Sequence, residues 1–173
     1  MQRPKVIAFV LAVVLALAAT PRAFADPWYA GNQRISVYGA GGTIFTPAGP
    51  PTLVNHDQSG EYSWIGTNAG GGWIQTGWAY MPWNGLSPAT QYTEWLAGGL
   101  YSGITPHGTQ CWGCAADYKV DYTGSNTWYA YINGVRQTSG VYPIPGGITA
   151  QALLEVHYSS YNQASTYFKK YCI

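Results

Sequence analysis

The sequence predicts an all-β fold, an antiparallel two-sheet β-sandwich or jelly roll. Short β-prone runs recur along the chain, turn residues separate them, and no stretch shows the apolar period of an amphipathic helix. The composition agrees with this prediction: 16% of the 173 residues are aromatic and 22 are glycine. Aromatic and β-branched residues favour strands, whereas glycine favours the tight turns between them.

The expected strands are runs rich in aromatic, β-branched or alternating residues between turn residues: 34–38, 62–66, 73–80, 91–97, 116–122, 127–132, 135–139, 150–159 and 166–173. Residues 116–122 alternate strictly between polar and apolar side chains, as in a strand with one buried face. Asn133-Gly134 predicts a two-residue hairpin turn, because both of its central positions need positive φ. We expect loops at residues 82–89 and 100–110.

The N-terminus reads as a cleavable secretory signal. Arg3 and Lys5 provide a positive start, and a 14-residue apolar run follows at positions 6–19. That run is shorter than the roughly 20 residues that a permanent membrane helix needs. Ala23-Phe24-Ala25 has the small-x-small form of a signal peptidase site. We therefore expect a signal peptide at 1–25, a single secreted domain at 26–173, and no membrane association after cleavage.

Charge excludes two classes of partner. Removal of the signal leaves five basic residues against seven acidic residues in the whole expected domain. A surface so poor in lysine and arginine has no electrostatic footprint for nucleic acid or anionic lipid. Nothing in the sequence calls for a cofactor.

Three cysteines lie in the expected domain: Cys111, Cys114 and Cys172. In an oxidising compartment at least two of them should form a disulfide, but the sequence leaves the pairing open. The spacing of Cys111 and Cys114 also occurs in redox-active sites, and His107 could join them as a zinc ligand. No βαβ pattern and no fourth ligand accompany them, so we expect a structural disulfide and no metal site.

Strand alternation sorts the polar residues by face. Gln75 lies on the same face as Trp73, and Glu94 lies on the same face as Tyr92. The strand at 150–159 places four side chains on one face: Gln151, Leu153, Glu155 and His157. Two interpretations stay open at this point. These faces either look at water, or they line the groove of a concave sheet.

Three motifs occur in the order in which the glutamic peptidases called eqolisins have theirs. They are Trp64-Ile65-Gly66, Trp73-Ile74-Gln75-Thr76-Gly77 and Tyr92-Thr93-Glu94-Trp95. The sequence resembles that family over residues 62–158, and the stretch at 73–78 is also similar to the plant neprosin domain. Both resemblances imply a concanavalin-like β-sandwich.

The eqolisin resemblance implies peptide hydrolysis by a glutamine and a glutamate that share one water. Gln75 matches the glutamine, whose amide stabilises the oxyanion, and Glu94 matches an accessory glutamate. The general base has two possible positions. If Ala150 aligns with the family's alanine, Gln151 occupies the catalytic position and Glu155 matches a second glutamate. In the register of neprosin, Glu155 is the base.

Three functions follow as hypotheses, of which the third is an extracellular structural or interaction protein. The first is a secreted endopeptidase that cleaves polypeptides at acidic pH with Gln75, Glu155 and the accessory Glu94. The second is a non-catalytic module that binds an extracellular polysaccharide or a cell-surface ligand, since tryptophan and tyrosine rings stack on sugars. For the first two functions the expected groove residues are Trp73, Trp78, Tyr92, Gln151 and His157.

Overall fold

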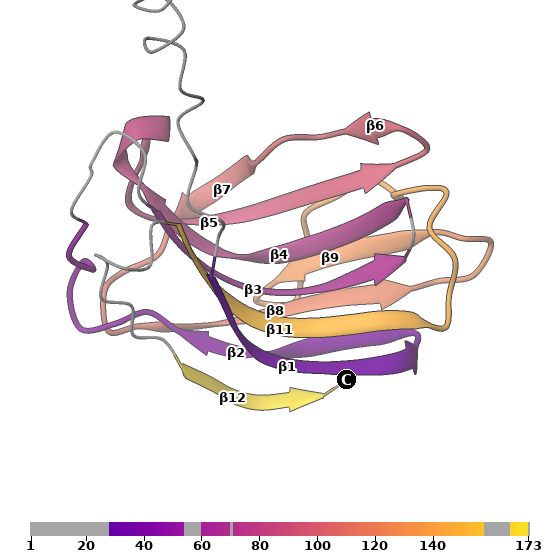
Figure 1. Cartoon of the computed structure of the whole chain (residues 1–173), viewed down its shortest axis with the longest axis horizontal. Coiled ribbons are helices and arrows are strands. Elements are labelled where there is room, and N and C mark those ends of the chain that lie inside the picture. Colours follow the sequence, from indigo (N-terminus) through magenta and orange to yellow (C-terminus); the bar gives the residue numbers. More distant parts are fainter. Residues whose placement is uncertain (1–27, 54–59, 70, 158–166, 173) are drawn as a thin grey trace, which may run out of the picture.

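The computed structural model describes residues 28–53, 60–69, 71–157 and 167–172, which form two antiparallel β-sheets packed face to face (Figure 1). This architecture confirms the all-β sandwich. The larger sheet has the order β1 (Trp28–Val37), β11 (Ile148–His157), β3 (Gly60–Ala69), β4 (Gly72–Met81), β5 (Leu86–Ala97) and β6 (Leu100–Tyr101), with β7 (Thr105–Thr109) also paired to β5. The smaller sheet has the order β10 (Val135–Arg136), β9 (Trp128–Ile132), β8 (Ala115–Tyr122), β2 (Gly39–Phe45) and β12 (Tyr167–Cys172).

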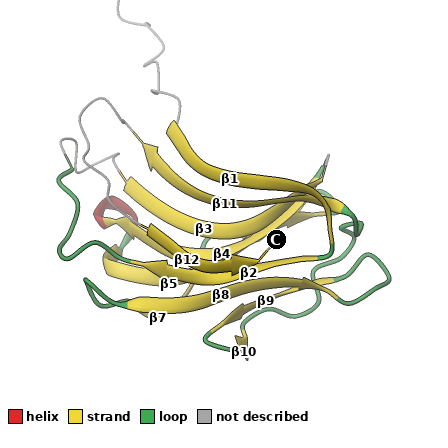
Figure 2. Ribbon diagram, turned by 90° about the horizontal axis from the view of Figure 1, so that it is seen from below, coloured by secondary structure: helices red, strands yellow, loops and turns green. Residues whose placement is uncertain are grey.

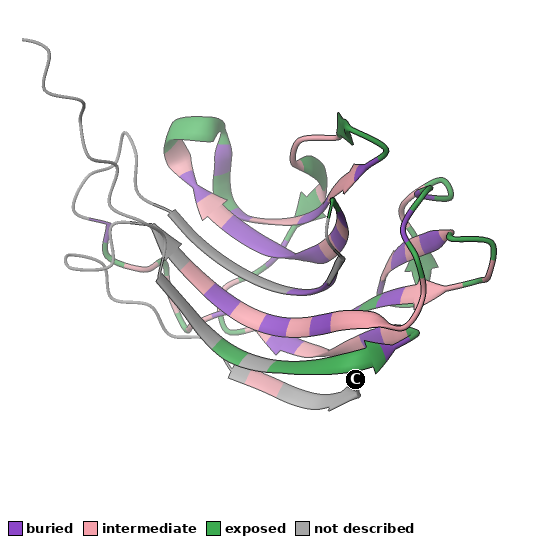
Figure 3. Ribbon diagram, turned by 45° about the vertical axis from the view of Figure 1, so that its right-hand side comes forward, coloured by how far each residue is buried: buried purple, intermediate pink, exposed green. Residues whose placement is uncertain are grey.

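The longer strands of the larger sheet are bent, as Figures 2 and 3 show from two directions. The helical structure among the described residues is one 3₁₀ turn, η1 (Pro82–Asn84), just before β5. No helix in this part of the chain has the length and apolar character needed to cross a membrane.

The core lies between the two sheets and comes from alternate residues of facing strands. On β8 every second side chain is buried, namely Ala116, Tyr118 and Val120. Trp78 of the larger sheet and Trp128 of the smaller sheet are both fully buried there. Burying a large apolar side chain contributes about 1.5–3 kcal/mol, so the period-two pattern fixes which face of each strand turns inward.

The structure corrects the expected strands in three places. The strand β2 was not expected, because its first four residues include three glycines, which weaken a strand signal. A Cβ at Gly41 would lie only 3.3 Å from Cγ of Lys119, so the neighbouring side chain packs close over this strand. The expected loops at 82–89 and 100–110 also contain β-structure, namely the start of β5, β6 and β7.

The strand β7 was missed because it contains Pro106, which lacks the N–H that a central strand requires. It lies beside β5 alone, at an edge of the sheet, where proline is tolerated. The expected hairpin turn is confirmed: Asn133 and Gly134 have φ values of 49° and 77°.

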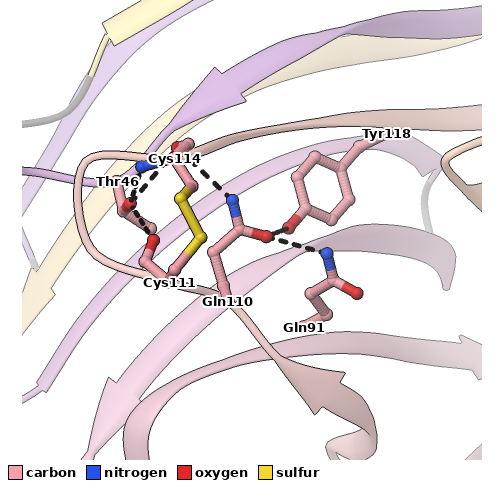
Figure 4. The surroundings of a disulfide bond; sticks show 6 residues. All are labelled: Thr46, Gln91, Gln110, Cys111, Cys114 and Tyr118. Carbon is pink, nitrogen blue, oxygen red and sulfur yellow. Dashed lines mark hydrogen bonds between the residues drawn. A yellow bond between two sulfur atoms is a disulfide. The ribbon is translucent and has the colours of Figure 1, made fainter.

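A disulfide joins Cys111 to Cys114 in the loop that leads from the larger sheet to the smaller one (Figure 4). The hydroxyl of Thr46, just after β2, donates to the carbonyl of Cys111 at 2.7 Å and accepts from the N–H of Cys114 at 3.2 Å. Between the cysteines, Trp112 makes edge contacts with Trp78 and Tyr80 at centroid distances of 6.1 and 5.3 Å. The closed loop therefore fixes one end of the sandwich.

The side chain of Gln110 connects this loop to both sheets (Figure 4). Gln110 is buried and accepts hydrogen bonds from Gln91 of β5 at 2.7 Å and from Tyr118 of β8 at 3.2 Å. Its amide also donates to the carbonyl of Cys114 at 3.4 Å. A buried amide is tolerated here because these bonds replace its bonds to water.

The disulfide settles two of the alternatives left open by the sequence. Cys111 pairs with Cys114, and the side chain of Cys172 lies outside the described residues. His107 does not complete a zinc site with these sulfurs; it hydrogen-bonds to the Thr93 hydroxyl at 2.7 Å. Within the described ranges there is no group of three or more metal-ligating side chains.

Replacing both Cys111 and Cys114 with serine should lower the free energy of unfolding by about 2 kcal/mol, because a ring of so few residues restricts the unfolded chain only modestly. Urea denaturation of the wild type and the double variant measures this difference. Adding a reductant should bring the wild type to the stability of the variant and leave the variant unchanged. A variant that cannot fold would show that the disulfide does more than close this turn.

Candidate functional site on the outer face of the larger sheet

A row of paired residues crosses the larger sheet. The Cα pairing places one residue from each of five neighbouring strands side by side: Gln33, Gln151, Gly66, Gln75 and Glu94. Residues on either side of this row in the same strands, such as Ile74 and Thr76, are fully buried in the core. Because side chains alternate along a strand, the row points away from the core, onto the outer face.

Gly66 leaves a gap in the row between Gln75 and Gln151. A Cβ at this position would lie 2.7 Å from Cβ of Gln75 and 2.6 Å from the carbonyl oxygen of Ile74, so a side chain would displace its neighbours. Adjacent strands are about 4.8 Å apart, which puts the Cα atoms of Gln75 and Gln151 roughly 10 Å apart. The two amides thus flank a position that carries no side chain.

Gln75 and Glu94 are directly bonded. The Nε2 group of Gln75 donates to Oε2 of Glu94 at 2.8 Å and to the hydroxyl of Tyr92 at 3.2 Å. The Tyr101 hydroxyl, from the short strand β6, donates to the other carboxylate oxygen of Glu94. Both N–H groups of Gln75 are used within the protein, so its amide oxygen is the group that can accept a hydrogen bond from a ligand.

Burial is the largest influence on the pKa of the Glu94 carboxyl group. It raises the pKa of this carboxyl above its usual value, since taking a charge out of water favours the neutral form. The hydrogen bond from Tyr101 opposes this effect, the negative charge of Glu155 adds to it, and the bond from Gln75 opposes it. For Tyr101, burial and the bond to Glu94 raise the pKa to about 12. Its hydroxyl therefore stays protonated as the donor to Glu94.

Glu155 lies outside the row. It pairs with Tyr62 of β3, and Tyr62 pairs with Ala79 of β4, four residues beyond Gln75. Four residues of strand span about 13 Å. The charge of Glu155 reaches Glu94 electrostatically, yet the residue opposite Gln75 across Gly66 is Gln151. The amide of Gln151 donates to Oε1 of Gln33 at 3.4 Å.

The expected groove residues have different positions in the structure. Trp73 is half-buried on the outer face, next to the row. Tyr92 is on the same face but fully buried, in a small apolar cluster that also contains Ala79, Met81 and Leu86. Trp78 was wrongly assigned to the groove: it is fully buried in the core, because it is separated from Gln75 by an odd number of residues. The backbone of His157 belongs to β11, and its side chain lies outside the described residues.

The sequence analysis missed Tyr101. It lies in a strand of two residues, which is too short to show any alternation. A weak signal was present in Gly98-Gly99, where both φ values are positive, 56° and 79°, and the chain turns back onto β5. The turn carries Tyr101 to Glu94.

The described chain is an antiparallel β-sandwich with a polar row on its outer face, and it is similar in fold to solved structures. It superposes on scytalido-glutamic peptidase, solved with a peptide-based transition state analogue, with a TM-score of 0.55 and 14% identity, over 83% of this chain and 75% of that chain. It superposes on the β-glucanase of Bacillus licheniformis with a TM-score of 0.51 and 10% identity, over 84% of this chain and 68% of that chain.

No family model matches the chain, and no curated protein matches it in sequence. At identities this low, the likeness shows the fold alone. It confirms the resemblance to glutamic peptidases at the level of fold, and the resemblance to neprosin stays a prediction.

The raised pKa of Glu94 predicts how stability depends on pH. The folded protein holds this proton to higher pH than the unfolded chain, so stability falls as the pH rises from about 4.5 through the folded pKa. In Glu94→Gln an acceptor oxygen is kept and the titration is removed. Denaturation at several pH values should show the wild type losing stability relative to Glu94→Gln as the pH rises. A difference that does not vary with pH would contradict this account.

Proposed function

We propose that the chain is an exported protein that binds an extended polypeptide on the outer face of the larger sheet and does not hydrolyse it. The observation that carries the proposal is the register of β11. This register puts the amide of Gln151, and not a carboxylate, opposite Gln75. Export is supported by the signal-like sequence expected at residues 1–25.

Hydrolysis by a glutamine and glutamate pair needs a group that removes a proton from water. A side-chain amide cannot do this, because it is neutral and has no ionisable proton acceptor in the physiological range. The neighbouring carboxylate, Glu94, already accepts from Gln75 and Tyr101 and lies on the far side of Gln75 from the Gly66 gap. By strand register Glu155 lies four residues beyond the level of Gln75, although its charge is close enough to raise the pKa of Glu94.

The same groups suit a polypeptide. The amide oxygen of Gln75 can accept a hydrogen bond from a backbone N–H of an extended chain, whereas Gln151, which uses one N–H on Gln33, can both donate to and accept from that backbone. No side chain of the row stands between Gln75 and Gln151, because the residue paired with both is Gly66, so one ligand segment can reach both amides. The fold shared with a peptidase that was solved with a peptide-based analogue supports this ligand class.

Acid-active hydrolysis is the second candidate, and one contact favours it. Glu94 touches Gln75 directly and its pKa is raised, so a small rearrangement could present a carboxylate to water beside Gln75. Glu155, on the same face, is the other possible base for this function. These two residues are therefore the ones to replace in a test of catalysis.

Catalysis is tested by incubating the purified protein with a denatured protein substrate at pH 4 and pH 7 and following fragments by mass spectrometry. We expect no cleavage by the wild type. Gln151→Glu, which places a carboxylate opposite Gln75, should gain slow cleavage at pH 4. Cleavage by the wild type that is lost in Glu94→Gln or Glu155→Gln would establish the peptidase instead.

Binding is tested by fluorescence anisotropy with a labelled, unstructured peptide mixture. Gln75→Ala should weaken binding by roughly 2- to 10-fold, the effect of one hydrogen bond worth about 0.5–1.5 kcal/mol. Gln137→Ala, a matched change in the loop after β10, should leave binding unchanged. Retention on insoluble polysaccharides without any peptide binding would contradict the proposal in favour of a carbohydrate module.

A further inference from the structure

An apolar row adjoins the polar row on the outer face. Trp73 of β4 pairs with Leu96 of β5, and Leu96 pairs with Tyr101 of β6. Each of the first two lies two residues from a member of the polar row, Gln75 or Glu94, and so shares its face. The rings of Trp73 and Tyr101 are 6.0 Å apart and tilted. We call this apolar row of three side chains, two aromatic rings with Leu96 between them, the aromatic row.

The aromatic row is open, and the ring of Tyr101 is held in place by its hydroxyl. Tyr101 is 60% exposed, although its hydroxyl is fixed on Glu94, and Trp73 and Leu96 are half-buried. On the other side of the polar row, the space is already filled. There Tyr92, Ala79 and Met81 are all buried, with Leu153 packed against them. Among the side chains of β4 and β5 that the structure describes, an apolar group of a ligand therefore meets an open surface on the Trp73 side of the polar row.

The spacing of the two rows matches that of an extended chain. Rows two residues apart along a strand are separated by about 6.6 Å. An extended polypeptide that runs parallel to the strands has the same distance between side chains i and i+2, which point to the same side. A ligand residue over Gln75 and Glu94 would thus place the side chain two positions away over the aromatic row.

We propose that the aromatic row of Trp73, Leu96 and Tyr101 is a specificity subsite for a large apolar or aromatic side chain, two residues along the polypeptide from the residue that contacts Gln75. This inference rests on the proposed binding function and adds the sequence pattern of its ligand. Rigid aromatic rings lose little conformational entropy when they bind, and they favour tilted or offset contacts with another ring.

The test uses labelled octapeptides with a serine and threonine host sequence. Each peptide carries one asparagine and one phenylalanine at separations of one, two or three residues, in both orders, and one peptide carries asparagine alone. We expect a separation of two, in one of the two orders, to bind at least 5-fold more tightly than asparagine alone. Separations of one and three should give no gain, because they put the side chains on opposite faces of the extended ligand.

Protein variants assign the gain to the aromatic row. Leu96→Ala should remove most of the 5-fold gain and leave the affinity for the asparagine-only peptide unchanged. Val135→Ala, at an exposed apolar position in the smaller sheet, is the control and should keep the gain. Circular dichroism checks that each variant is folded.

The outcomes separate the two proposals. Binding of every peptide with no gain at a separation of two, or a gain that Leu96→Ala keeps, overturns the subsite and leaves the binding function standing. No binding of any peptide overturns the binding function and the subsite with it.

Discussion

The pairing register of β11, β3, β4 and β5 is the constraint on which the site depends. Side chains alternate between faces, so a slip of one residue in any of these strands would exchange its core and outer residues. The buried side chains of β4 and β11, such as Ile74 and Ala152, prevent that slip because they are packed between the sheets. The core thereby keeps Gln75, Gln151 and Glu94 on the outer face, and the strand pairing aligns them in one row.

Within this row, the position of each polar side chain determines which chemical role it can have. Glu94 is a buried carboxyl group that two donors hold in place, and their hydrogen bonds only partly offset the burial that raises its pKa. Gln151 stands across the gap at Gly66, where it can bind but cannot take a proton from water. A fold shared with a peptidase is therefore compatible with a site that holds a chain without cutting it. This agrees with the general rule that function depends on the site and not on the fold.

The sequence was sufficient for the fold class and for several strands, because the period-two pattern reports directly on burial, as in β8. It also placed Gln75 with Trp73 and Glu94 with Tyr92 on the faces of their own strands, whereas the pairing of Gln75 with Glu94 comes from the structure. It could not decide between Gln151 and Glu155, since both have the same parity and only the pairing across β3 distinguishes them. The sequence could not predict the role of Tyr101 for a similar reason. Its hydrogen bond to Glu94 depends on a strand of only two residues and on a contact formed by the fold.

The central claim is that Gln75 and Gln151 together contact the ligand across Gly66. Side-chain amide NMR signals of glutamine report this contact directly during titration with a polypeptide ligand. The account predicts that the Gln75 and Gln151 signals shift together at one saturation midpoint, while the ligand stays intact over the titration. Shifts confined to residues around Glu155, with fragments of the ligand accumulating, would contradict it.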